Sequence, residues 1–358
     1  MNNLKITIEP RTLHFLQPAG TSRGVYTTRQ IWLLHLTSSD FPDREGVGEC
    51  APLPDLSCDW SYDYGKRLRN VCDLVETTGT IDYNILRPYP SMLFGLESAM
   101  LNLERGSMIY DTPFARGEEG IPINGLVWMG NFDEMNERME RKIEAGFSCV
   151  KLKIGAIDFS SELALIKSIR SRFSAQTIEL RVDANGGFSV EDAPHRLDEL
   201  SKYSIHSIEQ PIRQRNWAEM ARLCANTPLP IALDEELIGV NITGMKRELL
   251  ETIRPQYIVL KPSLHGGING TQEWIRLAHE YNVGCWITSA LESSVGLDVI
   301  AQLAAYEFGP FCRNSGTPTT YSQNFTPCMA QGLGTGSLYA DNLPPMTEVR
   351  GDKIFRLK

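Results

Sequence analysis

Short apolar runs alternate with amphipathic segments along most of this chain. Between residues 121 and 291 each run is rich in Ile, Leu and Val and ends in polar residues, and a segment with apolar positions at helical spacing follows. The unit repeats roughly every 25–30 residues, the size of one strand–helix pair. The predicted strands are 121–128, 148–155, 178–185, 206–212, 230–237, 256–263, 284–291 and, with the weakest pattern, 311–316. The predicted helices between them include 133–145, 161–173, 190–202, 217–225 and 271–281.

This number of strand–helix units predicts an α/β fold with a parallel barrel of the TIM type. The alternative is an open, doubly wound parallel sheet, which shows the same alternation but usually has fewer units. Such a sheet often carries a Gly-rich phosphate loop after its first strand. The segment at that place, GLVWMGN at 125–131, lacks this glycine pattern. The pattern therefore favours the barrel.

The N-terminal part of the chain has a different pattern. Segments 4–16 and 27–38 alternate apolar and polar residues as strands do, and segments 59–78 and 91–106 have helical spacing. Strands followed by helices predict a small α+β domain ahead of the barrel.

Composition narrows the class of protein further. The chain has 358 residues, a net charge of −9 and a pI of about 5.3, which argues against a nucleic-acid partner. The first residues contain no apolar signal segment, and no stretch is long and apolar enough to span a membrane. The eight cysteines form no C-x-x-C pair. We therefore expect a cytoplasmic protein that acts on a small molecule.

Ionisable residues gather at the predicted carboxyl ends of the strands, where barrel active sites lie. Asp183, Glu209 and Asp234 end three successive strands, so their side chains should meet at one mouth of the barrel. Three carboxylates this close need a cation, and oxygen ligands without Cys or His indicate Mg²⁺ rather than zinc. The alternative for each residue alone is a helix cap, a turn residue or an ion pair. Asn185, Glu235 and Glu236 are left as candidates, one of which would support a ligand.

Two lysines are predicted inside the barrel. Lys151 and Lys153 alternate with apolar residues on one strand, so both face the same side, and Lys261 ends a strand across the barrel. Burial and a neighbouring like charge lower the pKa of a lysine and make it usable as a general base. The alternative is a pair of surface lysines on an edge strand. Lys153 and Lys261 would then lie on either side of a metal, an arrangement that suits removal of a proton from the carbon next to a carboxylate.

Five motifs together resemble one known family, the enolase superfamily in its muconate-lactonising-enzyme subgroup. They are KLK at 151–153, VDAN at 182–185, IEQP at 208–211, LDE at 233–235 and LKPS at 260–263. The resemblance covers essentially the whole chain.

The resemblance implies both architecture and chemistry. It implies an α+β capping domain over residues 1–118, a modified (β/α)₇β barrel over 119–318 and a segment over 319–358 that returns to the capping domain. It implies Mg²⁺, with Mn²⁺ as a substitute, on the three carboxylates. It implies Lys153 as the base and Lys261 opposite it, and capping loops at 19–29 and 46–57 that close over the site.

Within the subgroup, residues 287–297 and 331–342 are most similar to o-succinylbenzoate synthases of menaquinone biosynthesis. That similarity implies a lyase that dehydrates 2-succinyl-6-hydroxy-2,4-cyclohexadiene-1-carboxylate through an enediolate. The candidates for substrate binding are Lys151, Asn185, Ser289 and Ser293. Gln331 stands where related sequences often have His, in what we expect to be the tail that contacts the capping domain.

Other functions remain open from the sequence, among them muconate cycloisomerisation, which residues 288–294 match less well. The same lysine pair and metal site would serve an N-acylamino acid racemase, for example one acting on N-succinylamino acids. From a different class, the chain could be a barrel scaffold without activity, although such a protein would be expected to have lost a lysine or a carboxylate. The sequence gives no indication of the oligomeric state.

Overall fold

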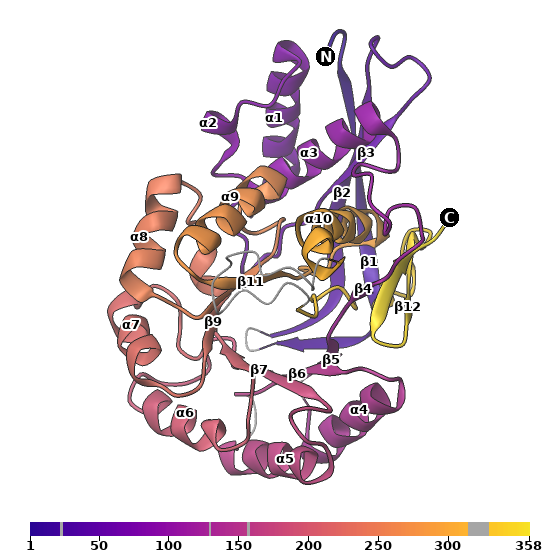
Figure 1. Cartoon of the computed structure of the whole chain (residues 1–358). Helices are drawn as coiled ribbons and strands as arrows, with labels where there is room; N and C mark the ends of the chain where they lie inside the picture. Colours follow the sequence, from indigo (N-terminus) through magenta and orange to yellow (C-terminus); the bar gives the residue numbers. More distant parts are fainter. Residues whose placement is uncertain (22–23, 129, 156–157, 314–328) are drawn as a thin grey trace.

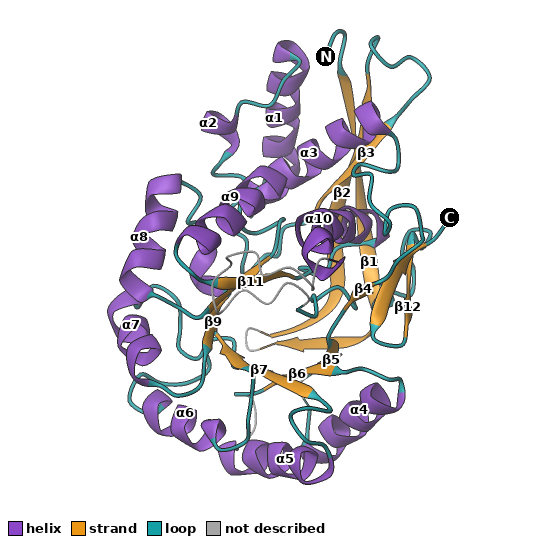
Figure 2. Cartoon of the chain, viewed as in Figure 1, coloured by secondary structure: helices purple, strands orange, loops and turns teal. Residues whose placement is uncertain are grey.

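The structure is a computed structural model, which describes residues 1–21, 24–128, 130–155, 158–313 and 329–358. An antiparallel sheet with its own helices lies beside a curled parallel sheet that is ringed by helices, as Figures 1 and 2 show. The predicted α/β barrel with an α+β cap is confirmed.

The capping part is built from the segments that the alternation pattern predicted. Its three strands pair antiparallel in chain order. Its elements are β1 (Lys5–Thr21), β2 (Gly24–Thr37), β3 (Gly46–Cys50), α1 (Tyr64–Thr78), α2 (Tyr83–Leu86) and α3 (Pro90–Arg105). Helix α3 packs closely on β3, because a Cβ added at Gly48 would lie 2.0 Å from the carbonyl oxygen of Gly95. Only glycine permits this approach.

Among the described residues, the barrel has seven parallel strands that neighbour one another in chain order. They are β5 (Gly125–Val127), β6 (Cys149–Lys153), β7 (Glu179–Asp183), β8 (Ser207–Glu209), β9 (Ile231–Leu233), β10 (Tyr257–Leu260) and β11 (Gly284–Ile287). The helices around them are α4 (Phe132–Glu144), α5 (Phe159–Arg172), α6 (Ala193–Ser201), α7 (Trp217–Asn226), α8 (Thr243–Ile253), α9 (Gly267–Glu280) and α10 (Ser294–Arg313). A 3₁₀ turn, η1 (Glu235–Leu237), follows β9.

A short segment far along the chain closes the barrel between its first and last strands. Gln331 forms a parallel bridge with Ile123 next to β5, and Gly332 forms one with Thr288 at the end of β11. The predicted strand at 311–316 is not the segment that closes the barrel, and the prediction is wrong for residues 311–313. Residues 311–313 end α10, and 314–316 lie outside the described residues.

Gln331 thus belongs to the barrel wall and not to the tail that contacts the capping domain. Its side chain is buried, accepting a hydrogen bond from the backbone N–H of Ile287 at 2.7 Å and donating one to the Met329 carbonyl at 2.7 Å. The amide satisfies two backbone groups where the barrel closes, which explains its presence there.

The last described residues contact both parts of the molecule. The backbone around Tyr339 pairs with β1 of the capping sheet, since it bridges to Phe15. A hairpin of β12 (Thr347–Arg350) and β13 (Lys353–Arg356) adds β4 (Ile121–Pro122) at the start of the barrel. The return to the capping domain is therefore seen, while the boundaries at 118 and 318 stay predictions.

The cysteines and the helices can also be compared with what the sequence predicted. Five of the cysteines that are described lie buried as free thiols, namely Cys50, Cys72, Cys149, Cys224 and Cys285, whereas Cys58 is exposed. Within the described ranges, no helix has the length and apolar character needed to cross a membrane.

Candidate active site

Three carboxylates stand side by side at the carboxyl ends of the parallel strands. Asp183 ends β7, Glu209 ends β8, and Asp234 directly follows β9; their exposed fractions are 0%, 2% and 0%. The strand register pairs Lys153 with Asp183 and Asp183 with Glu209. Pairing at the same level brings these side chains together, as the strand pattern predicted. The turn after Asp183 needs positive φ, which Asn185 adopts at 44°.

The lysines of the site contact these carboxylates directly. The Nζ of Lys151 lies 2.9 Å from Asp183 and donates to Glu209 at 2.6 Å. The Nζ of Lys153 donates to Asp183 at 2.7 Å, and Lys261 donates to Asp234. Lys151 and Lys153 are buried, so the prediction that both face the barrel interior is confirmed.

Charge pairing sets the electrostatics of the cluster. Burial acts to raise the pKa of Asp183, but Lys151 and Lys153 hold this pKa well below its usual value. Burial, and then the neighbouring Asp183, raise the pKa of Glu209 to about 8. Burial acts to lower the pKa of Lys151, yet Asp183 and Glu209 raise it above its usual value. The expected lowering of lysine pKa is thus wrong for Lys151, because the carboxylates outweigh burial.

The donor set fits a hard divalent cation. The Nζ atoms of Lys151 and Lys153 lie among the carboxylates, 2.9 Å and 2.7 Å from Asp183, and the described residues contain no group of three His, Cys, Asp or Glu that is already arranged around a metal position. However, Glu209 Oε1, Asp234 Oδ1 and Glu235 Oε2 are buried without a hydrogen-bond partner. Buried anionic oxygens normally have a partner, and a cation would supply one.

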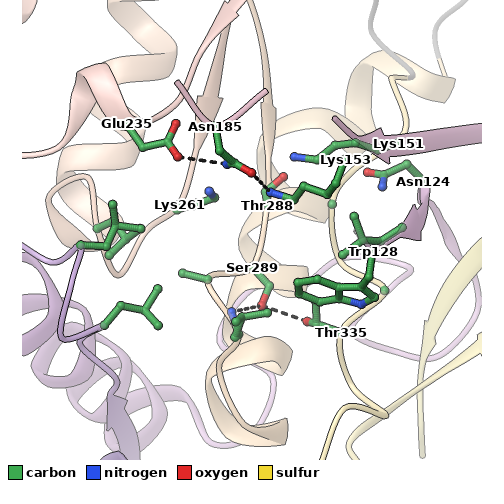
Figure 3. Close-up of a pocket in the computed structure, with 18 of the residues that line it drawn as sticks. Asn124, Trp128, Lys151, Lys153, Asn185, Glu235, Lys261, Thr288, Ser289 and Thr335 are labelled. Atoms are coloured by element: carbon green, nitrogen blue, oxygen red, sulfur yellow. Dashed lines mark hydrogen bonds between the residues drawn. The ribbon is translucent and has the colours of Figure 1, made fainter. Parts of the chain in front are cut away.

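Asn185 links two charged residues of the site (Figure 3). Its Oδ1 accepts from Lys153 Nζ at 2.7 Å, and its Nδ2 donates to Glu235 at 3.0 Å. These bonds fix the lysine against β7, so Asn185 orients the predicted base.

A pocket opens above this cluster, between the barrel mouth and the capping part. Lys153 and Lys261 reach it from different strands, β6 and the end of β10 (Figure 3). The lining residues include Tyr26, Leu53 and Leu56 of the capping part, and Trp128, Thr288, Ser289 and Thr335 of the barrel part. Apolar walls around a charged floor suit a small molecule that has an apolar body and a charged group.

The two predicted serines occupy different places. Ser289 lines the pocket, where its hydroxyl donates to Glu292 and accepts from Thr335. Ser293 lies behind the pocket wall, and its hydroxyl donates to Glu49 of β3. The sequence did not reveal this partner, which lies 244 residues away along the chain.

Sequence reasoning missed the role of one histidine. His265 lies in the turn after β10, and it is fully buried beside the site. Its Nδ1 accepts from the backbone N–H of Lys261 at 2.9 Å, so the proton lies on Nε2, 3.9 Å from Asp234 Oδ1. The only signal in the sequence was its position four residues after Lys261.

The fold and the site together define a (β/α) barrel protein whose acidic and basic side chains converge at the carboxyl ends of the strands. The Enolase C-terminal domain-like family matches residues 134–316. The chain belongs to the enolase superfamily, as the five motifs indicated.

Known proteins resemble the chain over nearly its whole length. An o-succinylbenzoate synthase of Desulfotalea psychrophila is 43% identical, covering 98% of each sequence. The crystal structure of MenC from Desulfotalea psychrophila LSv54 has a TM-score of 0.80 and 39% identity, covering 99% of this chain and 100% of that one. The o-succinylbenzoate synthase of Thermosynechococcus elongatus BP-1, complexed with Mg in its active site, has a TM-score of 0.73 and 21% identity over 95% of both chains.

Proposed function

We propose that this protein is an o-succinylbenzoate synthase, a carbon–oxygen lyase of menaquinone biosynthesis. It converts 2-succinyl-6-hydroxy-2,4-cyclohexadiene-1-carboxylate into 2-succinylbenzoate and water. The observation that carries the proposal is the placement of Lys153 and Lys261 at one pocket above three buried carboxylates. The 43% identical relative supports the choice of substrate within the superfamily.

The reaction needs a base close to the ring carbon that bears the carboxylate. Lys153, as the free amine, removes the proton from this carbon, and the electron pair of the broken C–H bond moves onto the carboxylate to give an enediolate. When this electron pair returns to the ring, the new ring double bond forms and the bond to the hydroxyl breaks. The protonated Lys153 returns the proton to the departing hydroxyl, which leaves as water. The hydrogen bond from Lys153 to Asn185 keeps the amine at the pocket wall.

Lys261 has a different part in this proposal. It remains an ammonium, because Asp234 beside it favours the charged form. From there it stabilises the negative charge that develops on the substrate, without transferring a proton.

Superfamily members use a divalent metal, and here Asp183, Glu209 and Asp234 would hold Mg²⁺, with Mn²⁺ as a substitute. When bound, the metal supplies positive charge for the carboxylate oxygens of the substrate. The partnerless oxygens of Glu209 and Asp234 support this assignment.

The other contacts to substrate follow from the pocket lining. We assign the succinyl end of the substrate to the wall that includes Ser289 and Thr335, both of which line the cavity. Lys151 and Asn185 line the pocket beside Lys153, and we assign the ring end of the substrate to this side. Ser293, the other serine predicted to bind substrate, does not line the pocket, and its hydroxyl donates to Glu49 instead. A cytoplasmic location stays a prediction from the sequence.

The decisive experiment follows loss of the diene absorbance with Mg²⁺ present, for the wild type and for Lys153→Ala. We expect turnover by the wild type and a loss of at least about 10²–10⁴-fold in the variant, the range of general-base contributions. Lys202→Ala, which removes an exposed lysine at the end of α6, is the matched control and should keep full activity.

Two outcomes would contradict the proposal. A Lys153→Ala variant with nearly normal turnover would remove Lys153 as the base. No turnover by the wild type would exclude the dehydration, and proton exchange of an N-succinylamino acid in deuterated water would then test the racemase.

A further inference from the structure

Arg29 of β2 is buried between the capping part and the barrel, with an exposed fraction of 2%. Its guanidinium donates to the carbonyls of Ala51 and Pro52 in the loop after β3. It also donates to the carbonyls of Ala290 and Leu291 in the turn after β11, both at 3.3 Å. One side chain therefore joins two main-chain segments that are about 240 residues apart in the chain.

Both segments form walls of the pocket. Leu53, directly after the first pair of carbonyls, lines the cavity from the capping side, and Ala290 and Leu291 line it from the barrel side. Carbonyls next to or within both walls are therefore hydrogen-bonded to the same guanidinium.

The turn after β11 needs this support. Leu291 has a φ of 66°, which an L-residue with a bulky side chain rarely adopts. Its carbonyl accepts from Arg29 and also from the hydroxyl of Tyr339 at 2.6 Å. Backbone conformations of this kind persist where the surroundings hold them, and they cluster at ligand sites.

We propose that Arg29 is a positioning residue that holds the 51–53 loop and the 289–291 turn at the spacing the substrate requires. It is not among the residues that line the pocket, so it does not touch the reacting atoms. The inference rests on the proposed function, because the spacing matters for binding the succinyl end of that substrate. Loss of Arg29 thus weakens binding and leaves the chemical step in place.

The chain offers a matched control for domain docking. Arg87 also connects the capping part to the barrel, donating to the Asn241 carbonyl and to Glu273, both at 3.1 Å, but it does not line the pocket. A general loosening of the two parts would appear in Arg87→Gln as well as in Arg29 variants.

The test measures KM and kcat of the Mg²⁺-loaded full chain for wild type, Arg29→Lys, Arg29→Gln and Arg87→Gln. We expect Arg29→Gln to raise KM about ten-fold or more, with kcat within about three-fold of wild type. Arg29→Lys should show a smaller rise, because a single ammonium cannot span four carbonyls. Arg87→Gln should leave KM unchanged.

Tyr339→Phe covers the case in which Arg29 variants fail to fold. It removes one hydrogen bond to Leu291 and should raise KM about three-fold or more. A normal KM in this variant and in any folded Arg29 variant, or an equal rise in Arg87→Gln, would overturn the inference.

Amide hydrogen exchange separates this inference from the proposed function, since it needs no substrate. Exchange in residues 288–293 should rise in Arg29→Gln, or in Tyr339→Phe where Arg29→Gln does not fold, and not in Arg87→Gln. Absence of wild-type turnover contradicts only the proposed function. Unchanged exchange in these variants contradicts the role of Arg29.

Discussion

The positions of the buried charged residues in this protein are best explained by the free-energy cost of burying a charge. A buried charge is unfavourable unless it is paired, so a strand end that carries Asp183 or Lys153 indicates a site rather than a contribution to stability. That reasoning located the cluster from the sequence. It could not locate Glu49 or Arg29, whose partners come from the other end of the chain. Contacts between distant segments leave no local pattern in a sequence.

Ser293→Ala tests how much the Ser293 hydroxyl contributes to stability through its hydrogen bond to the buried carboxylate of Glu49. Glu49 is buried and accepts from the Ser293 hydroxyl, from its backbone N–H at 2.9 Å and from that of Gly296 at 2.8 Å. Losing one donor to a buried carboxylate should lower the free energy of unfolding by about 1–3 kcal/mol. Urea denaturation measures this loss, and we expect KM to stay within about two-fold of wild type. A large rise in KM with unchanged stability would instead place Ser293 in contact with substrate.

At the scale of elements, strands with long apolar runs were predictable and the barrel closure was not. The runs that end in Lys153, Asp183 and Glu209 have the length and composition of buried strands. The closing segment around Gln331 bridges its neighbours with only two residues, which no periodicity can reveal. Its position is fixed by the need to join β5 and β11, a property of the closed sheet.

Two helices of the barrel begin against carboxylates of the capping part. Glu97 of α3 accepts from the backbone N–H groups of Ile268 and Asn269 in the first turn of α9, and Glu49 does the same for α10. A helix start exposes unpaired N–H groups and a partial positive charge, which a carboxylate satisfies. Packing between the two parts thus replaces the caps that the local sequence would otherwise supply.

The protonation of Glu97 should make this contact depend on pH. Burial raises its pKa from 4.5 to about 7, even though the N–H groups of Asn269 and Ile268 act to lower it. The folded state then binds a proton that the unfolded state has lost, so the contribution of Glu97 to stability decreases as pH rises from 4.5 to about 7. A ten-fold difference in proton affinity between the folded and unfolded states corresponds to about 1.4 kcal/mol.

Glu97→Gln removes this titration. As the pH rises from 4.5 to about 7, the free energy of unfolding of the wild type should therefore decrease relative to that of the variant. Urea unfolding of both proteins at several pH values measures the difference. Glu104→Gln, which changes a carboxylate on the same helix, is the control, and its stability should depend on pH in the same way as that of the wild type. A difference between wild type and Glu97→Gln that is independent of pH would contradict the raised pKa.

At the scale of the whole molecule, the pocket belongs to neither part alone. The barrel supplies the lysines and carboxylates, and the capping part supplies Tyr26, Leu53 and Leu56. The order of the parts and the identity of the barrel cluster could be predicted from the sequence. The shape of the pocket could not be predicted, because it depends on how the two parts pack. Their packing involves hydrogen bonds made by Arg29, Glu49 and Glu97 across the boundary between them.

Metal binding should stabilise the whole molecule, since it neutralises buried negative charge only in the folded state. We expect Mg²⁺ to raise the Tm of the wild type and to leave that of Asp234→Asn unchanged, because the variant loses an anionic ligand at the end of β9. Asp198→Asn, on the outer helix α6, should respond to Mg²⁺ as the wild type does. Differential scanning calorimetry with and without Mg²⁺ gives the comparison without any assay of activity. An equal rise in Tm for Asp234→Asn would place the ion elsewhere, and the three strand-end carboxylates would then need the lysines alone as their partners.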